Sequence, residues 1–172
     1  KLNQSAFILT LMSVFWDDGR TELEQFCRAA RQPAQAGQAS PFNQLFQPDP
    51  DHLLRVDVGV AFRRARLEHV YSLLRGKELA SGEVSLAQRD SQFGKLRDAQ
   101  GRVLNLTYWA DFLNVVRAAG YRSAKTISSV NALVFAYQLY LLGRTEYGVE
   151  GFKLRNAIAR WLFMSLLTGR FT

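Results

Sequence analysis

Two groups of basic residues are the strongest candidates for chemistry in this sequence. The first group comprises Arg55, Arg63, Arg64 and Arg66, and the second comprises Lys153, Arg155 and Arg160. A guanidinium group binds phosphate oxygens through paired hydrogen bonds and keeps its charge at physiological pH. Both groups are therefore candidates for salt-sensitive, sequence-independent contacts with the phosphates of nucleic acid.

Each basic group also has a simpler interpretation, which is a solvated or ion-paired outer face of a helical protein. At helical spacing Arg55, Arg63 and Arg66 share one face, with Arg64 near it, and the acids that could neutralise them are Glu68, Asp17 and Asp18. No aromatic residue sits regularly among either group in the sequence, as a base-stacking surface would require. The sequence leaves both interpretations open.

Residues that catalyse reactions or hold metals do not occur here at a recognised spacing. The chain has two histidines, His52 and His69, and a single cysteine, Cys27. Zinc, calcium, P-loop and nucleophile-elbow motifs are absent. Asp49 and Asp51 stand beside His52, but capping of a helix explains them better than a cation site does. We predict no catalytic residue, no metal site and no cofactor, and an enzyme built from these residues is the weakest hypothesis.

The overall charge agrees with an anionic partner. Lysine and arginine outnumber aspartate and glutamate by 22 to 15, which gives a formal net charge of +7. Such a charge attracts nucleic acid first and acidic protein surfaces second, although many helical domains are simply basic. One cysteine excludes an internal disulfide, and there is no signal-peptide pattern, so we expect a cytoplasmic protein.

Apolar periodicity predicts an all-α fold that must position these groups. The chain has 172 residues, 48% of them hydrophobic, which suits one helical domain over 1–172. Residues 130–142 are apolar on all sides except at Asn131 and Gln138, which predicts a buried helix that ends at Gly143. This helix is too short to span a bilayer.

Further helices follow from apolar spacing, caps and glycine stops. We predict them over residues 2–16, 22–31, 51–75, 84–103, 107–120 and 150–170, in a bundle of about six helices. Gly94 and Gly101 weaken the helix over 84–103. In this scheme Arg55, Arg63 and Arg66 lie on one long helix that stops at Gly76. No strand period appears.

Residues 32–50 are the longest predicted irregular segment. All four prolines lie in it, namely Pro33, Pro41, Pro48 and Pro50. Proline lacks an N–H donor and has a fixed φ, which excludes a long helix. Phe42, Leu45 and Phe46 indicate that the segment packs onto the bundle. A loop of this length is uncommon in a compact domain, which leaves a partner-binding role open.

Motifs along most of the 172 residues resemble a known bacterial family. They read ISSVNAL, FAYQLYLLGR, LRNAIARWLFMSLLTGRFT, LNQSAFILTLMSVFW, SPFNQLFQPDPD, AFRRARLEHVYSLLRGK and YWADFLNVVRAAGYRS. They are similar to a domain-of-unknown-function family typified by the GmrSD modification-dependent restriction system. That resemblance implies defence against foreign DNA. It also implies a ParB-like nucleotide-handling part and an HNH-type nuclease part, whose motifs this sequence lacks.

Two functional hypotheses follow. In the first, the chain is a non-catalytic helical module of a GmrSD-like restriction or anti-phage protein, whose parent is an NTP-dependent DNA endonuclease. The module would position the nucleotide-handling and nuclease parts and contact DNA phosphates. In the second, it is a scaffolding bundle for protein–protein interaction without a nucleic-acid role.

The ends of the chain, Lys1 and Thr172, lack an initiator methionine and a polar tail. We therefore expect a fragment of a longer multidomain protein. Its expected partners are the remaining domains of the parent protein, DNA and a second copy of the chain, with no membrane. We also expect exposed apolar surface near residues 7–16 or near Phe171.

Overall fold

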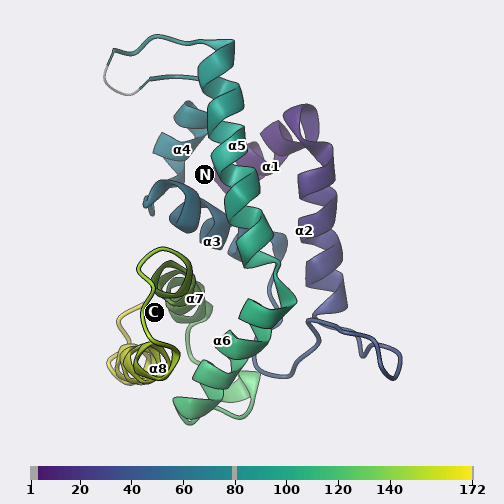
Figure 1. Cartoon of the computed structure of the whole chain (residues 1–172), viewed down its shortest axis with the longest axis vertical. Coiled ribbons are helices and arrows are strands. Elements are labelled where there is room, and N and C mark those ends of the chain that lie inside the picture. The colour runs from purple at the N-terminus through teal and green to yellow at the C-terminus, as the bar shows by residue number, and fades with distance from the viewer. Residues whose placement is uncertain (1–3, 79–80, 172) are drawn as a thin grey trace.

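The computed structural model describes residues 4–78 and 81–171, and it confirms an all-α fold (Figure 1). Within these ranges the chain forms eight α-helices and one short 3₁₀-helix, more than the six or so predicted. The α-helices are α1 (Gln4–Phe15), α2 (Asp17–Ala29), α3 (Pro50–Phe62), α4 (Leu67–Leu74), α5 (Leu86–Val103), α6 (Leu106–Ala118), α7 (Val130–Thr145) and α8 (Gly151–Leu167). The 3₁₀-helix, η1, spans Ala124–Thr126.

The long helix predicted over residues 51–75 does not exist as one element. It is divided into α3 and α4, and residues 63–66 turn the chain between them. The division lets the two parts pack differently, because α3 contacts α2 and α7 as well as α1 and α5, whereas α4 packs against α1 and α5. The contacts of α4 bury the side chains of Leu67, Val70 and Leu74.

Two helices occupy the centre of the molecule. α3 is buried almost all round, and it packs against α1, α2, α4, α5 and α7. α7 contacts α3, α6 and α8, and these contacts bury or partly bury most of its residues. This confirms the prediction of a buried helix over residues 130–142. In Figure 1, α3 lies between an upper group, formed by α1, α2, α4 and α5, and a lower group, formed by α6, α7 and α8.

Gly143 has a different role from the predicted helix stop. It is buried within α7, which continues to Thr145. A Cβ atom at this position would lie 2.5 Å from Cδ1 of Leu154 on α8. Glycine therefore permits the close approach of α7 and α8, and the prediction that it ends the helix is wrong.

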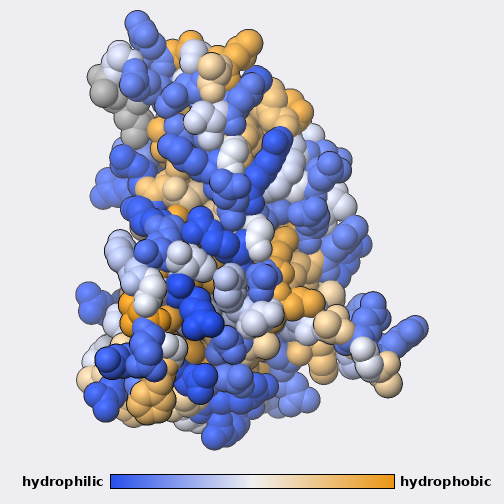
Figure 2. Space-filling model, viewed as in Figure 1, coloured by the Kyte–Doolittle hydropathy of each residue, from blue (hydrophilic) through white to orange (hydrophobic). Residues whose placement is uncertain are grey.

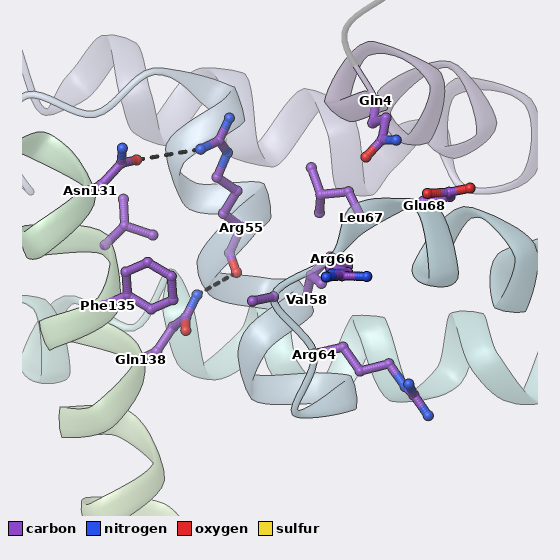
Figure 3. Close-up of a pocket in the computed structure, with 12 residues that line it drawn as sticks. Gln4, Arg55, Val58, Arg64, Arg66, Leu67, Glu68, Asn131, Phe135 and Gln138 are labelled. Atoms are coloured by element: carbon purple, nitrogen blue, oxygen red, sulfur yellow. Dashed lines mark hydrogen bonds between the residues drawn. The ribbon is translucent and has the colours of Figure 1, made fainter. Parts of the chain in front are cut away.

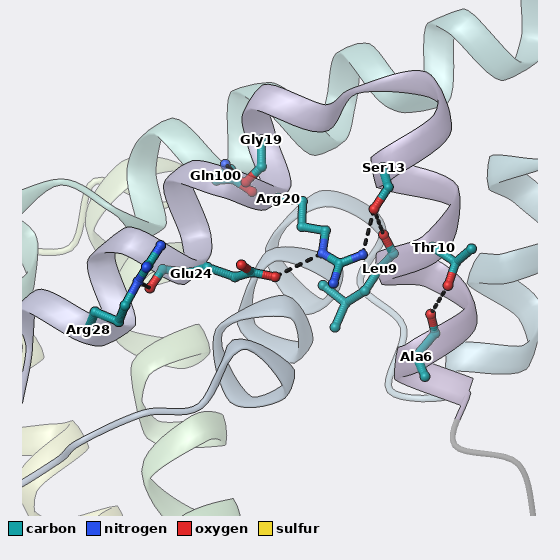
Figure 4. A network of polar contacts seen from close by, with 9 residues as sticks. All are labelled: Ala6, Leu9, Thr10, Ser13, Gly19, Arg20, Glu24, Arg28 and Gln100. Atoms are coloured by element: carbon teal, nitrogen blue, oxygen red, sulfur yellow. Dashed lines mark hydrogen bonds and ion pairs between the residues drawn. The ribbon is translucent and has the colours of Figure 1, made fainter.

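Polar contacts join the first two helices to each other and to α5 (Figure 4). The helix predicted over 22–31 begins earlier, at Asp17, and Arg20 on its first turns donates to Ser13 Oγ at 2.6 Å and to Glu24 Oε1 at 2.8 Å. Gln100 Nε2 of α5 donates to the Gly19 carbonyl oxygen at 2.9 Å. These bonds orient α2 against α1 and α5.

The proline-rich segment is irregular between α2 and α3, as predicted. Asn43 organises its second half, since its side chain donates to Phe46 O at 2.9 Å and accepts from Phe46 N at 2.7 Å. Leu45 and Phe46 are buried in the core, whereas Phe42 is 36% exposed. Residues 31–39 are exposed and project from the body (Figure 1).

Candidate nucleic-acid interface

The turn between α3 and α4 replaces the predicted arginine face of a single helix. Arg63 has φ 55°, the left-handed conformation, and its N–H donates to Gly59 O at 3.1 Å to close α3. This backbone conformation is uncommon for a residue with a Cβ atom and ends helical hydrogen bonding. The prediction that Arg55, Arg63 and Arg66 share one face of a continuous helix is therefore wrong.

The turn nevertheless brings three of the four predicted arginines to one site. A pocket of about 460 Å³ opens between α3, α4, α7 and the start of α1, and Arg55, Arg64 and Arg66 line it (Figure 3). Leu67 and Phe135 contribute apolar walls to the same pocket. Volumes of this size are typical of small-ligand sites in proteins.

Arg55 is held in place by its neighbours. Its Nη2 atom pairs with Asp51 Oδ2 at 3.0 Å, and its Nη1 atom donates to Asn131 Oδ1 at 3.4 Å. Gln138 Nε2 donates to the Arg55 carbonyl oxygen at 2.7 Å. The Nε atom of Arg55 is buried, and no group in the described part of the chain accepts its hydrogen.

Arg64 and Arg66 are exposed cations. Neither guanidinium group forms an ion pair or hydrogen bond with any residue in the ranges 4–78 and 81–171. In the view of Figure 3 the guanidinium groups of Arg55 and Arg64 lie at opposite ends of the site, with Arg66 between them.

The Arg63 guanidinium group is ion-paired within the fold and does not line the pocket. It forms an ion pair with Glu146, which also accepts from Arg102 Nη1 at 2.9 Å. Its Nη1 atom donates to the Val60 carbonyl oxygen. Glu146 follows α7 and Arg102 belongs to α5, so Arg63 ties the α3–α4 turn to both. The ion-paired interpretation is correct for this residue, with Glu146 in place of the acid expected from the sequence.

The second basic group is divided between two faces of α8. Lys153 and Arg160 are seven positions apart and therefore lie on one face of the helix. Arg155 instead lines a small pocket with Asp111, Tyr140 and Arg144. The structure thus does not assemble Lys153, Arg155 and Arg160 into a single cluster, and their role in nucleic-acid binding stays a prediction.

Two polar residues of α7 complete the pocket, and sequence reasoning did not assign them a role. Asn131 and Gln138 interrupt the apolar run of this helix, and both contact Arg55. Gly59 makes room for Gln138, because a Cβ atom there would lie 2.3 Å from Gln138 Cδ. The signal that could have revealed their role is their spacing, since two isolated polar residues seven positions apart lie on one face of an otherwise apolar helix. Such a pair indicates a polar neighbour that both residues contact.

The histidine and cysteine candidates have structural environments. Asp49 caps α3, and its N–H donates to His52 Nδ1 at 3.1 Å, while burial lowers the pKa of His52. Within the described ranges no three His, Cys, Asp or Glu side chains are grouped so that they could hold a metal ion. Cys27 is buried, and desolvation raises the pKa of its thiol to about 12, which favours the unreactive thiol form.

Asp57 is a buried acid outside the pocket. Its side chain is fully buried on α3, and neither carboxylate oxygen has a hydrogen-bond partner in the described part of the chain. Desolvation raises its pKa well above 3.8. Such a group is costly in its charged form, so Asp57 is a determinant of stability.

Comparisons with family models, with curated proteins and with solved structures found no match to this chain. Among the helices of the described residues, none combines the length and apolar character that crossing a membrane demands. The assignment of a function therefore depends on the pocket itself, and the resemblance to the GmrSD-type family stays a prediction.

Proposed function

We propose that this chain is a non-catalytic helical module that contacts nucleic-acid phosphates through the pocket beside the α3–α4 turn. The observation that supports it is the pair of exposed cations, Arg64 and Arg66, which have no partner among the described residues and line the same pocket as Arg55. From the resemblance above, the wider setting that we propose is a GmrSD-type restriction or anti-phage protein. There the module would position the nucleotide-handling and nuclease parts.

The charges around the pocket support a polyanionic partner. Asp51 neutralises Arg55 in part and Glu146 neutralises Arg63, whereas within the described ranges no acid forms an ion pair with Arg64 or Arg66. Phosphates that pair with these two cations would release condensed counterions to solvent. Affinity should therefore fall steeply as the salt concentration rises.

Replacement of Arg64 and Arg66 by glutamine tests this proposal. We expect the double variant to bind mixed-sequence duplex DNA at least about tenfold more weakly at low salt. The slope of log affinity against log salt should decrease in magnitude by about 1.8, since each lost phosphate contact removes about 0.9. Fluorescence anisotropy of a labelled duplex over a salt series measures both quantities.

The matched control is the double variant Lys95→Gln plus Lys125→Gln, which removes the same charge from exposed positions on α5 and η1. An equal loss from both double variants would show that general basicity, and not the pocket, attracts DNA. Binding by the unaltered protein that does not depend on salt would contradict the proposal.

Replacement of Glu68 is a second test, in which the affinity for DNA should rise and not fall. Its carboxylate lines the pocket beside Arg66 and should repel an incoming phosphate. We expect Glu68→Gln to tighten binding of the same duplex by about two- to fivefold at low salt. Glu83→Gln, at an exposed position outside this pocket, removes the same charge and should leave the affinity nearly unchanged. Weaker binding by Glu68→Gln would argue against a phosphate in the pocket.

A protein–protein scaffold is the second candidate function, and exposed apolar side chains support it. On α8, Phe152, Phe163, Met164 and Leu167 are each at least 46% exposed. On the face shown in Figure 2, apolar patches interrupt the hydrophilic surface at the lower left, where α8 lies in Figure 1. A scaffold without a nucleic-acid role would show no salt-dependent DNA binding, which separates the two functions.

Exposed apolar side chains also occur near the start of the chain, as the sequence suggested. Phe7, Val14 and Phe15 are 41%, 67% and 40% exposed. Phe171 differs from expectation, because its ring packs against Phe135 at 5.0 Å and Trp161 at 5.6 Å between centroids.

A further inference from the structure

The arginine pocket continues into an aromatic one. A second pocket of about 200 Å³ lies between α1 and α4 and is lined by Gln4, Phe7, Glu68 and Tyr71. Gln4 and Glu68 line both pockets, so the two are adjacent. The rings of Phe7 and Tyr71 are 5.8 Å apart between centroids and tilted by 54°.

Phe7 is not needed to bury α1 in the core. Ile8 and Met12 make that contact and are fully buried, whereas Phe7 remains 41% exposed. The Arg75 guanidinium lies 5.6 Å from the centroid of the Tyr71 ring, so a further cation borders the aromatic pocket. An exposed aromatic ring beside unpaired arginines is the combination that binds a base and its phosphate together.

We propose that the two adjacent pockets bind single-stranded nucleic acid, with the backbone on Arg64 and Arg66 and one base against Phe7 and Tyr71. This inference rests on the proposed function and specifies its ligand. A duplex hides the faces of its bases within the helical stack, whereas a single strand can place a base in an aromatic pocket. Gln4 and Glu68 stand between the arginines and the rings, where they offer donors and acceptors to the edge of the base.

The experiment compares Phe7→Ala with the unaltered protein on labelled DNA of one mixed sequence, as a single strand and as a duplex. We expect Phe7→Ala to weaken single-strand binding by about 5- to 150-fold, the range for loss of one stacked base. Duplex binding should stay the same, and Phe7→Trp should restore single-strand binding. An RNA strand of the same sequence shows whether the sugar matters.

Phe163→Ala is the matched control, because it removes an exposed aromatic ring from α8. Circular dichroism of each variant verifies folding. If Phe7→Ala binds the single strand as well as the unaltered protein does, or if Phe163→Ala weakens binding equally, the inference is overturned. Loss of duplex binding in the Arg64 and Arg66 variant would still support the proposed function in that case. If neither the single strand nor the duplex binds in a salt-dependent way, both this inference and the proposed function are wrong.

Discussion

Replacement of Trp109 by alanine should lower the free energy of unfolding by about 4 kcal/mol, within the range for loss of a buried tryptophan. The ring is 1% exposed and packs edge-on against Phe26 and Tyr137, with centroids 5.3 and 5.4 Å away. Phe46 of the proline-rich segment lies 5.5 Å from it. Its removal therefore leaves a cavity where α2, α6, α7 and that segment meet. Urea unfolding monitored by circular dichroism measures the change.

The same variant should loosen the proline-rich segment. Trp109 Nε1 donates to the Pro41 carbonyl oxygen at 2.9 Å, and alanine leaves this oxygen without its donor. Limited proteolysis should then cut within residues 31–49 faster than in the unaltered protein. Trp109→Phe is the control, since it keeps most of the packing and loses the hydrogen bond. An alanine variant that unfolds within about 1 kcal/mol of the unaltered protein would show that the ring is not central to the core.

The second large effect concerns Asp57 and the pH dependence of stability. Burial raises the pKa of this carboxyl group well above 3.8, so the folded protein retains the proton at pH values where the unfolded chain has lost it. The folded state then binds more protons than the unfolded state, and stability falls as pH rises. The stabilisation that the protonated Asp57 carboxyl group contributes is complete at pH values below the pKa of the unfolded chain, about 3.9. It is lost as pH rises to the pKa of the folded protein.

The slope over this window is about 1.4 kcal/mol per pH unit. Between pH 5 and pH 7 we therefore expect the unaltered protein to lose more stability than Asp57→Asn, which cannot ionise, by up to a few kcal/mol. Urea unfolding at both pH values gives the difference. His52, whose pKa is lowered by burial, contributes stability that is lost as pH falls, but it is present in both proteins and cancels.

Asp98→Asn is the matched control for Asp57→Asn, because Asp98 is exposed on α5. It should leave the pH dependence unchanged. Parallel stability curves for the unaltered protein and Asp57→Asn would mean that Asp57 is ionised in the folded state by a partner that the structure does not provide among its described residues. Cys27 and Tyr137, whose electrostatic interactions include Asp57, have raised pKa values and stay neutral over this range.

The helices could be predicted where burial follows a local period. Leu23, Phe26 and Cys27 recur at helical spacing in the sequence and are buried on α2. Trp109, Phe112, Leu113 and Val116 recur at the same spacing and are buried on α6. These predictions succeed because residues three and four positions apart on a helix face the same side, whatever surrounds them.

The break after α3 could not be predicted in the same way. Neither glycine nor proline occurs between Phe62 and Leu67, and the apolar spacing continues through the turn. Arg63 takes the left-handed conformation where the chain turns from α3, which also packs against α2 and α7, to α4, which packs only against α1, α3 and α5 among the helix pairs with the most contacts. Gly143 illustrates the converse, since a residue that commonly ends helices serves here as a contact point for α8.

The sequence by itself determined the all-α class, the stripes that form the core, the excess of positive charge and the residues from which a phosphate site could be built. Only the tertiary structure decided which arginines are free to bind. Glu146 reaches Arg63 from the end of α7, and Phe7 of α1 lines a pocket adjacent to the one that Arg66 lines. The physical reason is that helical periodicity depends on near neighbours in the chain. Ion pairs and pocket walls instead join residues that meet only when all the helices have packed together.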